Sequence, residues 1–227
     1  MDIQLNYCEK GSGFPVILLH GNGESLDYFT HQITCFSENY RVVAIDTRGH
    51  GQSPRGTAPF SISQFAEDLH NFMDEVGIEK AHILGFSDGG NIALTFALRY
   101  PERVEKLILN GANLYSAGVK VSVQLPIVLG YRIASWFEKK SPEAKKNAEL
   151  LGLMVNEPNI RPEELKQLQT RTLVIVGKRD MIKESHTRLI AESLPDAQLK
   201  IIPGDHFIAN RNPEEFNRVV GSFLADK

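Results

Sequence analysis

A serine set among glycines carries the clearest chemical signal in the sequence. Ser87 lies in the stretch GFSDGG, between the apolar run HILGF and the helix-like run GGNIALTFALRY. A sharp strand-to-helix turn strains the serine backbone and crowds its neighbours, and glycines relieve that crowding. The pattern Gly85-x-Ser87-x-Gly89 matches a nucleophile elbow, which presents a serine hydroxyl to a carbonyl carbon. We therefore interpret Ser87 as a nucleophile.

A serine hydroxyl needs a base to take its proton, and that base needs an acid to orient it. Asp180 comes just after the apolar run TLVIVG, and His206 comes just after the next run, LKIIPG. Around a nucleophile elbow, the acid and then the histidine are expected on loops after later strands. The chain order Ser87, Asp180, His206 therefore predicts a catalytic triad.

Other candidates for the acid and the base fit this pattern less well. Asp205 adjoins His206, so its side chain is expected to point elsewhere. The strand after the elbow helix ends at Asn110, and this strand end offers no carboxylate. The remaining histidines are interpreted as structural residues at strand ends and turns (His20, His50, His82) or as surface helix residues (His31, His70, His186).

Acyl transfer also requires donors for the developing oxyanion. One expected donor is the backbone N–H of Asp88, the residue after the nucleophile. The other is expected on the loop after VILLHG, where we favour the N–H of Asn22 and place Gly23 second. The Asp88 carboxylate itself has two interpretations. It stabilises the start of the following helix, where negative charge is favourable, or it pairs with a cation on the substrate.

Strand-like and helix-like segments alternate along the chain. The strand segments are short, apolar and mostly not alternating, as expected for strands that are buried on both faces. They read IQLNYC, PVILLHG, YRVVAID, KAHILGF, VEKLILNG, RTLVIVG and AQLKIIPG. Helices are expected after Ser61, over 89–99, after Asp180 and over 213–224. This alternation predicts an α/β fold with a mostly parallel central sheet and helices on both faces.

The segment 113–169 breaks the alternation because it holds no strand candidate. We interpret it as a helical lid insertion, with residues 1–112 and 170–227 forming the core. Its apolar stretch VQLPIVLGYRIASWF is expected both to pack onto the body and to roof a pocket at the carboxyl edge of the sheet. The residues expected to contact the substrate there are Leu125, Ile127, Tyr131 and Trp136.

Composition excludes several function classes. The 227-residue chain has a net charge of −3, which argues against nucleic-acid and membrane partners. We expect a cytoplasmic protein, since the chain shows no signal-peptide pattern and no run long enough to span a bilayer. Cys8 and Cys35 are interpreted as buried or half-buried free thiols. No metal site is expected, because no cysteine or histidine cluster has ligand spacing. Nothing in the sequence indicates an oligomeric state.

At the level of motifs, the chain resembles the α/β-hydrolase superfamily over nearly its whole length. The segments LLHGNGES, DTRGHGQS and GFSDGG, followed by the late aspartate and histidine, occur in the order typical of that family. The resemblance implies a hydrolase of esters, thioesters or amides that uses no cofactor. In DTRGHGQS we interpret Arg48, His50 and Ser53 as supports of the loop beside the pocket. The elbow GFSDGG is similar to the GWSDGG of valacyclovir-hydrolase-like enzymes, which act on amino-acid esters.

These observations lead to one principal hypothesis and three alternatives. The principal hypothesis is a serine hydrolase that cleaves small carboxylic esters through an acyl-enzyme on Ser87. The first alternative is an aminoacyl-ester hydrolase in which Asp88 binds the substrate amine. The second is a hydrolase of carbon–carbon bonds, and the third is a ligand receptor on a hydrolase fold, because fold alone does not determine function.

Overall fold

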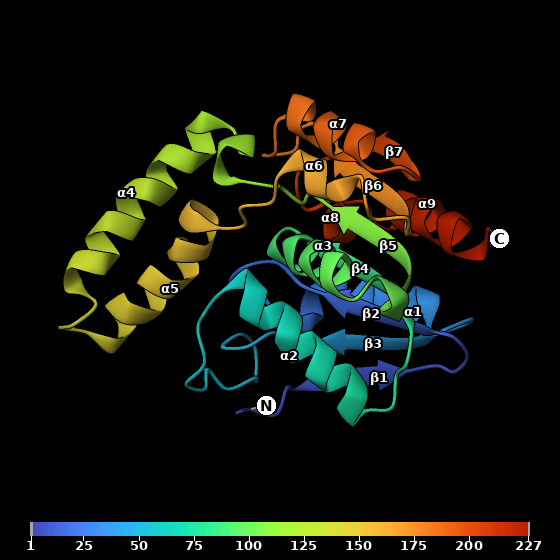
Figure 1. The fold of residues 1–227 in the computed structure, drawn as a ribbon, viewed down its shortest axis with the longest axis horizontal. Coiled ribbons are helices and arrows are strands. Elements are labelled where there is room, and N and C mark those ends of the chain that lie inside the picture. The colour runs from blue at the N-terminus through green and yellow to red at the C-terminus, as the bar shows by residue number, and fades with distance from the viewer. Residues whose placement is uncertain (1, 227) are drawn as a thin grey trace.

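A seven-stranded sheet forms the centre of the computed structural model, which describes residues 2–226 (Figure 1). The strands are β1 (Tyr7–Lys10), β2 (Pro15–Leu19), β3 (Arg41–Ile45), β4 (Ala81–Phe86), β5 (Val104–Asn110), β6 (Arg171–Gly177) and β7 (Ala197–Ile202). Their spatial order is β1-β3-β2-β4-β5-β6-β7, and only β1 runs antiparallel to its neighbour. This confirms the predicted α/β fold with its mostly parallel sheet. The first strand begins later than the segment IQLNYC indicates.

Helices cover both faces of the sheet. The helices are α1 (Thr30–Phe36), α2 (Ile62–Glu75), α3 (Asp88–Arg99), α4 (Val121–Phe137), α5 (Pro142–Asn156), α6 (Pro162–Leu165), α7 (Glu184–Ser193), α8 (Ile208–Arg211) and α9 (Pro213–Ala225), with short 3-10 turns η1 (Leu26–Phe29), η2 (Pro101–Arg103) and η3 (Ser116–Gly118). Helices α2, α3 and α7 pack on one face, and α1, α8 and α9 pack on the other. Helices α1 and α8 lie outside the segments that were predicted to be helical.

Side chains alternate between the two cores along each strand. In β2, Ile17 and Leu19 point toward α2 and α3, whereas Val16 and Leu18 point toward α1 and α9. All four are at most 1% exposed. Strands buried on both faces explain why these segments read as continuous apolar runs in the sequence. The same parallel arrangement places the carboxyl ends of β2, β4, β6 and β7 along one edge of the sheet.

The insertion between β5 and β6 forms a helical hairpin of α4 and α5, followed by the short α6. Figure 1 shows α5 between α4 and the rest of the molecule. Helix α4 packs against α5 and does not pack on the sheet or its flanking helices. The expectation that this apolar stretch packs onto the body therefore holds only through α5.

Two further features complete the fold. Cys8 and Cys35 are exposed free thiols, so the prediction that they are buried or half-buried is wrong. The reason for Cys8 is its place on β1, an edge strand whose four residues are all exposed. Among residues 2–226, no helix combines the length and the hydropathy needed to cross a bilayer.

Candidate active site

Ser87 occupies the turn between β4 and α3, and its backbone is strained. It has φ 53° and ψ −119°, and it is the one non-glycine residue with positive φ in the described part of the chain. The Ser87 N–H donates to the carbonyl of Asn110 on β5 at 2.8 Å, which fixes the turn. A Cβ added at Gly89 would overlap the carbonyl of Leu19, so the next helix can pass β2 only with glycine there. Strain of this kind is characteristic of functional sites.

His206 lies between Ser87 and Asp180 and joins them by hydrogen bonds. Its Nε2 is 3.0 Å from the Ser87 Oγ, and its Nδ1 is 2.8 Å from the Asp180 Oδ1. Because a carboxylate only accepts, Nδ1 carries the proton and Nε2 is left to accept the serine proton. The Asp180 Oδ1 also accepts the backbone N–H of Ile182 at 2.8 Å. The structure thus brings together the three residues that the sequence singled out.

Backbone packing holds the His206 ring in this orientation. Gly111, at the end of β5, has φ 65°, and a Cβ there would lie 2.7 Å from the ring Cε1. The imidazole therefore rests directly on the Gly111 backbone. Asp205 takes no part in this arrangement, since its carboxylate accepts the Phe207 N–H at 3.0 Å and pairs with Arg211. Its side chain is thus directed to Phe207 and Arg211, in agreement with the prediction that it points elsewhere.

The loop after β2 passes beside the nucleophile. A Cβ added at Gly21 would lie 3.3 Å from the Ser87 Cβ, which places the following residue, Asn22, next to the serine. The backbone N–H groups of Asn22 and Asp88 form no backbone hydrogen bond with any residue that the structure describes. Two N–H donors near one serine, one from the loop after β2 and one from the first residue of α3, are the arrangement that an oxyanion hole requires.

The side chain of Asn22 also reaches the lid. Its Nδ2 donates to the carbonyl of Leu150 on α5 at 2.7 Å. A second contact joins the same helix to the core, because Arg55 binds Glu149 through two hydrogen bonds of 2.8 and 3.0 Å. A third is the 2.7 Å hydrogen bond from the Ile62 N–H to Glu157 at the end of α5. Helix α5 is thus attached to the core by polar contacts at three points.

Asp88 is a buried carboxylate directly beside the nucleophile. Its Oδ1 accepts from the Asn91 Nδ2 at 3.2 Å, and the same amide nitrogen donates to Asn113 at 3.1 Å. The Asp88 Oδ2 has no hydrogen-bond partner among the described residues. Burial raises the pKa of Asp88 to about 6, against the opposing influence of Asn22, His206 and Asn91. Asn91 thus holds one oxygen of the carboxylate, and the Asn22 side chain lies near enough to the group to lower its pKa.

Histidines outside this constellation have structural contacts. His20 accepts the Thr47 N–H through Nε2 at 3.0 Å, and burial lowers the pKa of His20 to about 4. His186 is buried and accepts the Leu114 N–H at 3.0 Å, so its assignment to the surface is wrong. It faces inward because α7 packs on the start of the lid segment. Among residues 2–226, no three histidine, cysteine or acidic side chains gather in a way that could hold a metal ion.

The DTRGHGQS loop is held rigidly by buried polar contacts. Arg48, which is 1% exposed, binds both oxygens of Asp68 at 2.7 Å. The Ser53 hydroxyl donates to the carbonyl of Asp46 at 2.7 Å. His50 stacks on Phe60, which brings the loop to the edge of the cavity described next.

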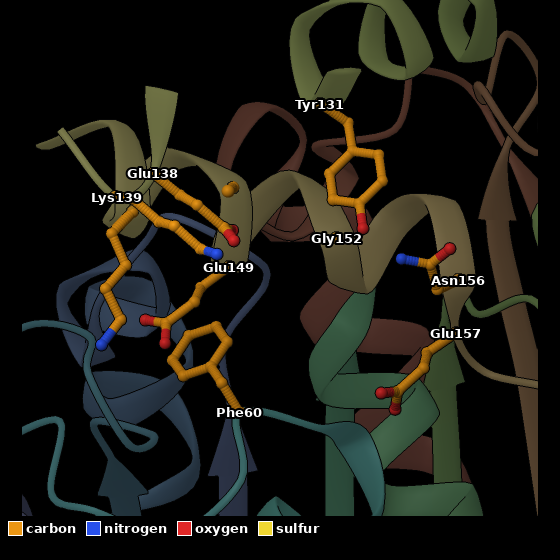
Figure 2. A pocket seen from close by; sticks show the side chains of 10 residues that line it. Phe60, Tyr131, Glu138, Lys139, Glu149, Gly152, Asn156 and Glu157 are labelled. Carbon is orange, nitrogen blue, oxygen red and sulfur yellow. The ribbon is translucent and has the colours of Figure 1, made fainter. Parts of the chain in front are cut away.

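A cavity of about 510 Å³ lies between the lid helices and the core (Figure 2). Its lining comprises Phe60, Tyr131, Glu138, Lys139, Lys145, Ala148, Glu149, Gly152, Asn156 and Glu157. Of the residues expected to contact the substrate, only Tyr131 lines it. Leu125 and Trp136 are 66% and 78% exposed, and the structure does not bring them to this cavity or to Ser87.

Two acidic residues near the site were missed in the sequence. Glu24 is half-buried two residues beyond Asn22, close enough to His206 for their charges to interact, and burial raises its pKa. Glu157 lines the cavity, interacts electrostatically with Asp88, and also has a pKa raised by burial. Glu24 could have been recognised from the sequence, because it lies in the same loop after β2 as the expected oxyanion donor Asn22. Glu157 could not be recognised from the sequence, because only the fold of the lid brings it to the site.

Comparison with known proteins identifies the family. The family model described as the alpha/beta hydrolase fold matches residues 15–132. This chain belongs to the α/β-hydrolase family. A putative carbamate hydrolase RutD from Caulobacter sp. strain K31 is 31% identical to this α/β hydrolase over 92% of the chain and 90% of the relative. A 2-hydroxymuconate semialdehyde hydrolase from Pseudomonas putida is 28% identical over 97% of this chain and 90% of the relative.

A solved structure agrees with these relatives. The meta-cleavage product hydrolase of Pseudomonas fluorescens IP01 superposes on this α/β hydrolase with a TM-score of 0.80 and 28% identity, covering 98% of this chain and 94% of the other. The fold and the family expected from the motifs are therefore confirmed, and the relatives are named as hydrolases.

Proposed function

We propose that this α/β hydrolase is a serine hydrolase that cleaves small carboxylic esters through an acyl-enzyme on Ser87. The observation that carries the proposal is the continuous hydrogen-bonded chain from the Ser87 Oγ through His206 to Asp180. This series of hydrogen bonds ends at Ser87, whose strained backbone and flanking free N–H groups suit acyl transfer.

In this proposal the first half of the reaction forms the acyl-enzyme. The Ser87 Oγ attacks the ester carbonyl while the His206 Nε2 takes its proton. Asp180 holds the Nδ1–H and stabilises the imidazolium that forms. The N–H groups of Asn22 and Asp88 donate to the oxyanion. The imidazolium then gives its proton to the leaving alkoxide, which departs as the alcohol.

The second half of the reaction repeats these roles with water. The His206 Nε2 takes a proton from water, and the resulting hydroxide attacks the acyl carbonyl. Collapse of the tetrahedral intermediate releases the carboxylic acid and returns the proton to Ser87. Every step uses side chains and N–H groups of this chain, and no cofactor enters the proposed reaction.

The experiment that tests the proposal is steady-state hydrolysis of nitrophenyl esters with short, neutral acyl groups. Turnover by the parent protein and its loss in Ser87→Ala are expected. Circular dichroism of the variant serves as the control for folding. Turnover that persists in Ser87→Ala would contradict the role of the serine.

A buried carboxylate beside the nucleophile favours a second candidate, an aminoacyl-ester hydrolase. The Asp88 Oδ2 is buried beside the nucleophile without a partner among the described residues, and an ammonium group on the substrate would satisfy it. Matched esters with and without a free α-amine test this candidate. Asp88→Asn should reduce kcat/KM only for the amine-bearing ester, and equal losses on both esters would exclude the role.

The names of the relatives favour a third candidate, hydrolysis of carbon–carbon bonds. Relatives named 2-hydroxymuconate semialdehyde hydrolase and 2-hydroxy-6-oxononadienedioate/2-hydroxy-6-oxononatrienedioate hydrolase are 28% and 30% identical over 97% and 99% of this chain. Spectroscopic assay with a dienone substrate tests this candidate. Turnover of the dienone with a kcat/KM above that of every ester would replace the ester proposal.

A further inference from the structure

The carboxylate of Asp2, which precedes β1 in the chain, holds the loop that follows the DTRGHGQS motif. Its Oδ1 accepts from the Arg48 Nη2 at 2.6 Å, and its Oδ2 accepts the backbone N–H groups of Thr57 and Ala58 at 2.6 and 3.0 Å. The Arg48 Nη1 and the Thr57 hydroxyl also donate to this Oδ2, at 3.1 and 3.2 Å. Consecutive N–H groups that point at one anion form a backbone nest. Asp2 therefore holds both the side chain of Arg48 and the backbone of residues 57 and 58.

The backbone at Gly56 is shaped to receive this carboxylate. Gly56 has φ 61°, and a Cβ added there would lie 2.5 Å from both the Asp2 Oδ2 and the Arg48 Nη1. Only glycine adopts this conformation so close to the ion pair without strain. The Arg48 Nη1 also donates to the carbonyl of Arg55 at 3.1 Å. The loop 55–58 is thus fixed through its N–H groups by Asp2 and through a carbonyl by Arg48.

The same loop carries two side chains that reach the lid and the cavity. Arg55 binds Glu149 on α5 through hydrogen bonds of 2.8 and 3.0 Å, and its guanidinium lies 4.9 Å above the centre of the Phe60 ring. The Arg55 Nη1 also donates to the carbonyl of Ala58 at 2.7 Å. Phe60 and Glu149 both line the cavity between lid and core (Figure 2). A shift of the loop would therefore displace a wall of the cavity together with an attachment point of the lid.

The contacts of Asp2 fit a role in positioning better than a role in global stability. The Arg48 side chain is fully buried, but it keeps Asp68 as a second, buried partner, so loss of Asp2 leaves no unpaired buried charge. The Asp2 side chain is 30% exposed, so solvent screens its charge. Asp2 is not one of the described residues that line the cavity. Its effect on a ligand in the cavity must therefore pass through the loop.

We propose that Asp2 is a positioning residue, which holds the loop 55–58 and thereby keeps Phe60 in the cavity wall and Arg55 on the lid. Through these two side chains it sets the affinity for a substrate bound in the cavity. This kinetic consequence rests on the proposed hydrolysis, whereas the positioning of loop and lid does not. The triad Ser87, His206 and Asp180 makes no hydrogen bond with the loop 55–58 among the described residues. The chemical step should therefore be little affected.

The test compares the full-length protein with Asp2→Ala in two measurements. Amide hydrogen exchange should become at least about tenfold faster in residues 55–60 and in α5, with unchanged exchange in α3. For a nitrophenyl ester, KM should rise by about fivefold or more while kcat stays within about twofold of the parent. A contact that serves only global stability would instead accelerate exchange in all three segments and leave KM unchanged.

Two further variants control the comparison. Glu9→Ala removes a carboxylate that binds Arg41 through two hydrogen bonds of 2.9 Å, at a distance in sequence from the loop. It is the matched control and should keep the exchange rates and the KM of the parent. Asp2→Asn keeps the size of the side chain and removes its charge. It should shift both readouts in the same direction as Asp2→Ala by a smaller factor, and it carries the test if Asp2→Ala does not fold. Thermal melting establishes the folding of every variant.

Three results would overturn the proposal. The first is unchanged exchange in residues 55–60 of a folded Asp2 variant, which would mean that the loop is held by other contacts. The second is equal acceleration in α3. The third is a loop that exchanges faster with an unchanged KM, which would remove the link to substrate affinity. Absence of ester turnover by the parent protein would contradict the proposed function, and the exchange measurement would still decide whether Asp2 positions the loop and the lid.

Discussion

The core around Ser87 and the lid hairpin use apolar residues in opposite ways. In the core, Phe96 and its neighbours are fully buried, and polar groups such as Arg48 and Asp68 are paired. In the hairpin, α4 exposes side chains as large as Trp136. Residue type alone therefore does not indicate what a position contributes. The core gains stability and a rigid site from its apolar residues, whereas α4 holds its apolar residues toward solvent.

The largest difference between the two regions is expected in catalytic activity, when the nucleophile is removed from the core and an apolar side chain is removed from α4. Ser87→Ala should lower kcat for a small soluble ester by about a thousandfold or more, because no other described hydroxyl contacts His206. Leu129→Ser, at an exposed position of α4, should leave kcat within about twofold of the parent. Stopped assays on matched protein concentrations measure both. Ser87→Ala activity within tenfold of the parent would contradict the comparison.

Stability should differ between the regions by a similarly large margin. Phe96→Ala should lower the free energy of unfolding by about 3–5 kcal/mol, because it opens a cavity in a fully buried cluster. Trp136→Ala, although it removes a larger side chain, should change the free energy of unfolding by no more than about 0.5 kcal/mol. Urea unfolding followed by circular dichroism provides both values. A large loss for Trp136→Ala would show that α4 packs against the body in solution.

A buried charge at the site should make the stability of the core depend on pH. Burial raises the pKa of Asp88 from 3.8 to about 6, so the folded state disfavours its ionised form. The unfolded chain ionises first as the pH rises, and the folded state therefore loses stability between about pH 4 and pH 6. Asp88→Asn removes the titrating carboxyl and with it this loss. The free energy of unfolding of the variant, relative to that of the parent, should therefore rise by up to about 3 kcal/mol between pH 4 and pH 7.

Urea unfolding at several pH values measures this difference. The control is Asp74→Asn, at an exposed aspartate on α2, which should show no comparable rise. A constant difference between Asp88→Asn and the parent across the pH range would mean that the carboxyl is already satisfied in both protonation states.

The smallest effect is expected where the two regions meet. Arg55 and Glu149 join the core to α5, but their side chains are 34% and 22% exposed, so solvent screens the pair. Arg55→Ala should therefore cost about 0–1 kcal/mol in global stability. Its effect should instead be local, as faster amide hydrogen exchange in α5 with unchanged exchange in α3. Equal acceleration in both helices would show that lid and core unfold as one unit.

The parts of the molecule that could be predicted from sequence are those with strong local patterns. Continuous apolar runs located the sheet, because both of its faces are buried. The glycines around Ser87 located the turn, since only glycine permits the close approach of α3 to β2. Asp180 and His206 were found because parallel strands bring their carboxyl ends to one edge of the sheet.

The lid could not be predicted in the same way. The apolar spacing of α4 is compatible with burial on either side, so the sequence did not indicate which residues face solvent. Leu125 and Trp136 were expected at the substrate, and the structure exposes both. The opposite error occurred at His186, whose polar neighbours in sequence concealed a buried contact with Leu114. In both cases tertiary packing decided the outcome, and local sequence carries little information about it.

The hydrogen bond from the Asn22 side chain to Leu150 has a mechanical consequence. In the proposed reaction the backbone N–H of Asn22 donates to the oxyanion, while its side chain donates to the lid helix α5. The same residue thus contacts both the lid and the transition state. A displacement of α5 that breaks this bond would release the Asn22 side chain, and we expect it to lower the rate of the chemical step through the neighbouring oxyanion donor.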